Sequence, residues 1–210
     1  MTRIIALVLL AVAALVTVDF ATSRRAGFRE FDGATMGRLD ADMWRSYYER
    51  RPVRLFWQLA ASHREQFNTG VLRSFKVAYL AARAAFTFKD GRSREEYARA
   101  LPDLERYFTT LNSIAAEPFD PRQAARDELE WWIIRREPAQ HATADWERYV
   151  AAVASNIYHR PPEVVAEYAR LRVEAMVVRD QRGEEITEAD WAGIRSTLVA
   201  GWRALAAAVR

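Results

Sequence analysis

The sequence predicts an all-α protein: a single multi-helix bundle of about seven helices, preceded by an N-terminal apolar anchor or signal helix. From about residue 39 onward, apolar residues recur at the three- and four-residue spacing of amphipathic helices, and no segment alternates as a strand does. Short connections rich in Pro, Gly or Asn separate these segments, which favours antiparallel neighbours. We therefore expect an anchor or signal over residues 1–23, a tether over 24–37 and a helical domain over 38–210.

The N-terminal segment is an apolar run over residues 4–18 that contains one Thr and follows Arg3. Its fifteen residues are fewer than the ~20 that span a bilayer, and extension through Thr22 reaches that length. We expect residues 4–22 to contact a membrane as an uncleaved anchor. A cleaved signal peptide and a buried soluble helix are the alternatives.

The charges that flank this run give conflicting signals for orientation. Arg3 favours an N-terminus in the cytoplasm, whereas Arg24 and Arg25 favour the opposite. We expect the protein to be membrane-anchored, with its soluble domain outside the cytoplasm. The following residues, 24–37, contain three glycines, which indicates a loosely ordered tether.

Turn and capping signals delimit the first helical segments of the domain. Pro52 ends one segment and opens the next, and Asn68–Gly70 forms a stop signal. Ser93 and Glu96 form a capping-box pattern, and Pro102 predicts a kink or a new helix. The expected helices cover residues 39–50, 53–68, 71–88 and 93–114, the last interrupted at Pro102.

Pro121–Glu137 is the central helix of this prediction. Pro121 suits the first turn, because its missing N–H would have no intrahelical partner there. Apolar residues lie on two sides of the helix: Ala125, Leu129, Trp132 and Ile133 on one, and Ala124, Trp131 and Ile134 on the other. A helix that is apolar on two sides is typically enclosed by its neighbours.

The last three helices are expected over residues 143–157, 163–179 and 187–209. Thr143 and Thr187 are candidate N-caps of the first and the third. Pro161 and Pro162 restart the chain into the second. Each segment carries an apolar face, so the domain can bury a substantial core.

Composition and missing motifs exclude several classes of function. The chain has a net charge of +3 with signs interspersed, which is not the pattern of a nucleic-acid-binding protein. It has no Cys, which removes disulfides and thiolate metal sites, and no Glu-x-x-His or His-Glu-x-x-His pair. Phosphate-binding glycine loops and Gly-x-Ser-x-Gly are also missing. The sequence thus indicates neither a metal nor a cofactor.

Two arginines occupy positions where a core residue is expected. Arg136 lies on the main apolar stripe of the central helix, and Arg172 lies at the centre of the apolar face of residues 163–179. A buried guanidinium cannot lose its proton and must find acceptors, so a carboxylate should lie inside with it. Glu128 is the best candidate, followed by three others: Asp42, Glu49 and Glu65. The alternative is that each arginine extends its stem to solvent.

His63 lies on an apolar face of its helix. It is a candidate haem ligand or base, but a core histidine bonded to a backbone carbonyl is the more common outcome, and we favour that interpretation.

Two functional hypotheses follow. The first is a membrane-tethered or exported helical module that binds a protein partner or a small-molecule ligand. The second is an enzyme whose bundle pocket of buried Arg and Glu acts on an anionic substrate. The candidate ligand-binding residues are Glu128, Trp132, Arg136, Arg172 and His63.

Overall fold

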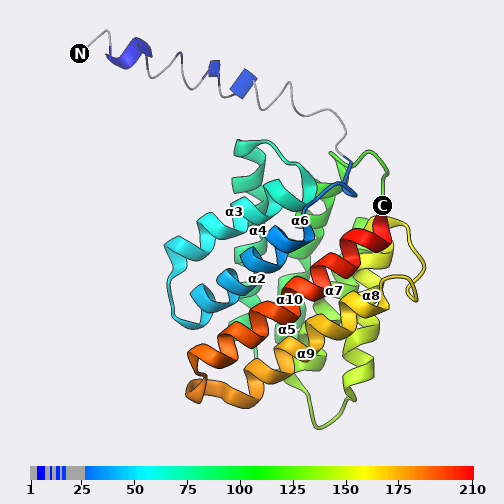
Figure 1. Cartoon of the computed structure of the whole chain (residues 1–210). Coiled ribbons are helices and arrows are strands. Elements are labelled where there is room, and N and C mark those ends of the chain that lie inside the picture. Colours follow the sequence, from blue (N-terminus) through cyan, green and yellow to red (C-terminus); the bar gives the residue numbers. More distant parts are fainter. Residues whose placement is uncertain (1–3, 8–9, 11–12, 15, 18–26) are drawn as a thin grey trace.

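The computed structural model describes residues 4–7, 10, 13–14, 16–17 and 27–210, and Figure 1 shows the chain. Throughout residues 27–210 the regular structure is helical and no β-strand occurs, which confirms the predicted fold class. This part of the chain contains nine α-helices rather than about seven. They are α2 (Gly33–Tyr48), α3 (Pro52–Phe67), α4 (Val71–Asp90), α5 (Arg94–Tyr97), α6 (Leu101–Asn112), α7 (Pro121–Arg136), α8 (Thr143–Tyr158), α9 (Ala166–Arg182) and α10 (Glu188–Val209), with 3₁₀ turns η1 (Ala98–Ala100) and η2 (Gly183–Glu185).

The long helices form two packed layers. Figure 1 shows α3, α2, α10 and α9 side by side in that order, and each of them contacts the next. Helices α4, α6, α7 and α8 form the second layer in the same way. The contacts α3–α4 and α8–α9 join the layers at the two edges, so the helices close into a ring of neighbours around one interior.

The central helix α7 is enclosed, as its two apolar sides predict. Leu129 and Ile133 are buried on one side and Trp131 and Ile134 on the other. Asp120 caps the helix by accepting hydrogen bonds from the backbone N–H groups of its first turn, at 3.0 and 3.1 Å.

The predicted tether needs correction over its second half. Helix α2 begins at Gly33, where Asp32 accepts from the backbone N–H of Thr35 at 2.9 Å. Phe28 and Phe31, just before it, are buried. Two of the three glycines that suggested a loose segment, Gly33 and Gly37, are instead residues of close helix packing, since a Cβ on Gly33 would lie 2.5 Å from the carbonyl oxygen of Trp202.

The chain follows one of the two alternatives predicted at Pro102, and two other boundaries differ from the prediction. Pro102 opens α6 after the 3₁₀ turn η1, so the interruption there is a new helix. Helix α9 begins at Ala166, three residues after the expected start. Thr143 is the first helical residue of α8 rather than its cap, and Asp145 accepts from the Ala142 N–H at 3.2 Å instead.

The predicted anchor or signal falls mostly outside the described residues. Within the part of the chain that is described, no helix combines the length and the apolarity needed to cross a bilayer. Residues 1–3 and 18–26, which include the expected charged flanks and the start of the tether, lie outside the description.

Candidate functional site

Arg172 and Asp40 form an ion pair inside the bundle. Arg172 extends from α9 and donates to Oδ2 of Asp40 on α2. The Asp40 side chain is almost completely buried. The same oxygen accepts a hydrogen bond of 2.8 Å from the indole Nε1 of Trp202 on α10. The Arg172 guanidinium also lies 5.6 Å from the ring centre of Trp44 and 6.0 Å from that of Trp202. The cation therefore has a carboxylate and two aromatic faces as partners.

The electrostatics of the pair keep Arg172 charged. Burial alone would lower the pKa of Arg172, but the adjacent Asp40 carboxylate outweighs it, so this pKa lies above its usual value. An arginine in this position has no protonation event to contribute near neutral pH.

Close packing of α2 on α10 positions Asp40. A Cβ on Gly37 would lie 2.7 Å from the backbone nitrogen of Val199, so only glycine permits this approach. Gly33, Gly37 and Asp40 follow one another at helical spacing on the same face of α2. The glycines thus bring α10 close enough for Trp202 to reach Asp40.

Glu128 is near Arg172 but is not its hydrogen-bonded partner. Its Oε1 accepts from the indole Nε1 of Trp132, one turn along α7, at 3.0 Å. Burial raises the pKa of Glu128, and the positive charge of Arg172 partly opposes that rise. Our expectation that Glu128 would be the direct partner was therefore wrong, and Asp40 takes that role. The other three candidate carboxylates bond elsewhere: Asp42 to Arg195, Glu49 to Arg45 and Arg51, and Glu65 to the backbone N–H of Asp32.

His63 is a buried core histidine. Its Nδ1 lies 2.5 Å from the carbonyl oxygen of Leu59, and its Nε2 lies 3.1 Å from the hydroxyl of Tyr107. Since a carbonyl only accepts, Nδ1 carries the proton and Nε2 accepts from the tyrosine. Burial lowers the pKa of His63 from 6.5 to about 4, which keeps the ring neutral. Both ring nitrogens are occupied within the protein.

Arg136 does not join the interior cluster. It is the last residue of α7, is exposed, and lies with its guanidinium 5.5 Å from the ring centre of Phe88. At the end of the helix, the Arg136 side chain reaches solvent, which is the alternative that the sequence analysis left open. Its neighbour Arg135 is the more buried of the two, and donates to Asp180 at 2.6 Å and to the hydroxyl of Tyr48 at 2.6 Å.

Trp132 of α7 lies beside Glu128 and packs against Phe88 of α4. Its ring centre is 5.2 Å from that of Phe88 and 6.0 Å from that of Trp131. Of the five residues that the sequence analysis named, the structure places Glu128, Trp132 and Arg172 around one interior region. His63 lies in the same interior beside Tyr107, and the charge of Glu128 contributes to the raised pKa of Tyr107, after burial.

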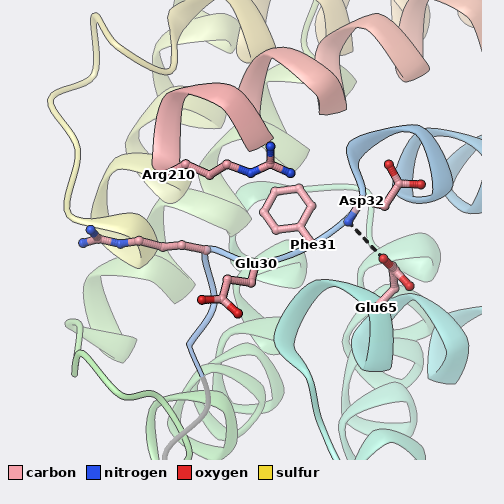
Figure 2. Close-up of a pocket in the computed structure, with 6 residues that line it drawn as sticks. Glu30, Phe31, Asp32, Glu65 and Arg210 are labelled. Carbon is pink, nitrogen blue, oxygen red and sulfur yellow. Dashed lines mark hydrogen bonds between the residues drawn. The ribbon is translucent and has the colours of Figure 1, made fainter.

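Among the described residues, two of the open surface depressions can be compared with this region, and neither is lined by Arg172, Glu128 or His63. One lies between the start of the domain and the C-terminus. Figure 2 shows Phe31 there, between Arg210 and Glu65. The backbone N–H of Asp32 donates to Glu65 at 3.0 Å. The other follows the α2–α10 groove beside Trp191. Among the described residues, no group of three His, Asp or Glu side chains is placed to hold a metal ion.

Asp40 and Trp202 are the site residues that sequence reasoning missed. The available signal was the spacing of Gly33, Gly37 and Asp40, which puts a carboxylate on the face where two small residues allow another helix to approach. Comparison with protein-family models, with curated proteins and with solved structures finds no match to this chain.

Proposed function

We propose that this chain is a membrane-tethered helical module that acts by binding, with residues 4–22 as its membrane contact. In this proposal the Asp40–Arg172 pair joins α2 and α9 within one layer, Glu128 lies near the cation from α7 of the other layer, and none of the three acts on a substrate. The observation that carries this proposal is the pairing of Arg172. Its guanidinium already has the Asp40 carboxylate and the ring faces of Trp44 and Trp202 as partners within the protein. Binding then takes place on the outer surface of the bundle.

The apolar run and the enclosed interior support this proposal together. Residues 4–18 contain no charged residue, and extension to Thr22 reaches spanning length, which is typical of an N-terminal anchor. The Arg172 side chain is 17% exposed, but an anionic substrate would have to displace Asp40 from it, and neither of the two depressions described above is lined by Arg172. We therefore rank the binding module above the enzyme.

Substitution of Arg172 by Met tests the role of the interior pair. If the pair holds the helices together, Arg172→Met lowers the free energy of unfolding by about 3–5 kcal/mol, because Asp40 keeps a buried negative charge without its cation. Replacing both members by apolar residues, Arg172→Met with Asp40→Leu, should recover much of that loss. Urea unfolding of the four proteins measures this cycle. Unchanged stability in Arg172→Met would remove the structural assignment and favour a ligand site.

Fractionation tests the tether. The full-length chain should sediment with membranes, resist extraction by high salt and be released by detergent, since apolar insertion is insensitive to ionic strength whereas surface attraction is screened. Recovery of the full-length chain entirely in the soluble fraction would contradict the proposal.

A further inference from the structure

The outer surface of α3 and α4 carries apolar side chains that no other described element covers. We call the surface formed by Val53 and Trp57 of α3 and Phe75, Tyr79 and Phe86 of α4 the α3–α4 face. Val53 is 72% exposed, Trp57 58%, Tyr79 53% and Phe86 50%. Large apolar residues scattered singly over a surface are ordinary, whereas a contiguous group indicates contact with something apolar.

These residues form one continuous surface. The ring centre of Trp57 lies 4.9 Å from that of Phe75, so the two helices join there. Along α4, Tyr79 and Phe86 lie about 40° and 20° from Phe75 around the helix axis, at about 100° per residue. Val53 lies one turn before Trp57. Tyr79 and Phe86 thus face outward, while Val77 and Ala78 of the same helix are buried.

The same hairpin carries a net positive charge larger than that of the whole chain, so the charges are less evenly interspersed than the sequence analysis stated. Residues 50–92 contain nine Arg and Lys and two Asp and Glu, a net charge of +7, whereas the whole chain carries +3. The rest of the chain is therefore at −4. The cationic residues beside the face are Arg54 and Arg64 on α3 and Lys76, Arg83 and Lys89 on α4.

Most of these cations have no acidic partner. Arg83 pairs with Asp103 at 3.0 Å, but no ion pair in the described part of the chain involves Lys76, Lys89, Arg54 or Arg64. In the rest of the described chain, eleven of the nineteen arginines form ion pairs, as Arg135 does with Asp180 and Arg170 with Glu167. Exposed Trp, Tyr and Phe bordered by unpaired Lys and Arg match the composition of a surface that lies at the headgroup level of a negatively charged bilayer.

The hairpin also lies where the domain meets its N-terminal segment. The rings of Phe28 and Phe67 are in edge contact at 4.8 Å, and the N–H of Asp32 donates to Glu65 at 3.0 Å. The chain therefore joins the bundle against the C-terminal end of α3, beside the α3–α4 turn (Figure 1). The apolar segment that we propose as the membrane contact ends at residue 22, only a few residues before this point.

We propose that the α3–α4 face lies on the surface of a bilayer that contains anionic lipids, with its aromatic residues at the headgroup level and its cations against the lipid phosphates. This inference rests on the proposed tether, which holds the face at the membrane, and it names the lipid surface as the partner of the module. Each cation near such a surface strengthens the contact by about fivefold. Reversing the charge of two of these cations should therefore release the α3–α4 face from the lipid surface.

Site-specific labelling of the full-length chain tests this proposal. The chain has no Cys, so Val53→Cys introduces a unique attachment site for an environment-sensitive fluorophore beside Trp57. Gln181→Cys, exposed on α9 at the opposite edge of the layer, is the matched control. The labelled chains are inserted into nanodiscs of phosphatidylcholine alone or with phosphatidylglycerol, and acrylamide quenching is measured. We expect quenching at position 53 to fall by about twofold or more in anionic discs, with no change at position 181.

Charge variants show whether the cations of the face cause the effect. Lys76→Glu with Lys89→Glu should abolish the protection at position 53. Arg122→Glu with Arg148→Glu changes the net charge equally on α7 and α8 and should leave the protection intact. Equal loss in both pairs would overturn the proposal, because the effect would then reflect overall charge.

The remaining outcomes separate this proposal from the tether. Flotation of the full chain with both kinds of vesicle, combined with unchanged quenching at position 53, would overturn the docking face and leave the tether intact. Failure to float with either would overturn the tether. Equal protection of position 53 in neutral discs would also overturn the anionic-lipid assignment. Protection in detergent that grows with protein concentration would overturn it too, and would indicate that a second copy of the chain covers the face.

Discussion

The interior of the bundle and the α3–α4 face differ in how their cationic and aromatic side chains are satisfied. Inside, Arg172 has a carboxylate partner, two aromatic faces and little water. On the outer face, Trp57, Tyr79 and Phe86 are half exposed beside lysines that have no ion pair among the described residues. The same residue types thus stabilise the fold in one region and remain available for contact in the other. Four measurements test this difference.

Removal of Asp40 should have the largest effect on stability. Asp40→Ala leaves the Arg172 guanidinium buried without its anion, and we expect a loss of about 3–5 kcal/mol in the free energy of unfolding. The control is Asp42→Ala, two residues away on the same helix, whose pair with Arg195 is exposed and should contribute about 1 kcal/mol or less. Urea unfolding measures both. Similar losses in the two variants would mean that the interior pair is no different from a surface pair.

Glycine substitution tests the packing that positions Asp40. Gly37→Ala would place a Cβ 2.7 Å from the backbone nitrogen of Val199, so α2 and α10 must separate, at a cost of about 1–3 kcal/mol. Gly193 lies at an exposed position of α10, where an added Cβ meets nothing within 4 Å. Gly193→Ala should therefore stabilise the helix by about 0.5–1 kcal/mol. Thermal unfolding should shift in opposite directions for the two. A stabilised Gly37→Ala protein would refute the close α2–α10 approach.

The buried His63 should make stability depend on pH. Its pKa falls from 6.5 in the unfolded chain to about 4 in the folded protein, so the unfolded state binds the proton first as the pH decreases. The resulting stability is complete above pH 6.5 and is lost progressively toward pH 4. The loss amounts to about 2 kcal/mol between about pH 7.5 and about pH 5.

Variants isolate this contribution from that of Glu128, whose raised pKa acts in the opposite direction, since its contribution is lost as the pH rises. His63→Gln should remove the acid-side loss relative to the wild type, whereas His159→Asn, exposed and in a left-handed conformation that Asn tolerates, should not. A pH profile unchanged by His63→Gln would contradict the neutral, buried histidine.

The smallest effect is expected on the outer face. Phe86→Ala should lower the free energy of unfolding by about 1 kcal/mol or less, because the ring is half exposed. The control is Phe88→Ala, two residues further along α4, whose ring is buried against Tyr97 and Trp132 and whose loss should cost about 3–5 kcal/mol. Chemical unfolding of the pair measures the difference. A large loss in Phe86→Ala would show that the face is part of the core and would remove the argument for docking.

The sequence alone determined the fold class, the approximate helix positions and the enclosure of α7, and it placed Arg172 on the apolar face of its helix. These follow from local rules, because proline, glycine and capping residues delimit helices and the spacing of apolar residues shows which face is buried. Only the tertiary structure decided that Asp40 is the partner of Arg172, that Arg135 and not Arg136 is the more buried, and that Tyr79 and Phe86 face outward. Spacing along a helix gives the direction of a side chain but not the neighbour that it meets, and that neighbour depends on how closely other helices approach and where they end.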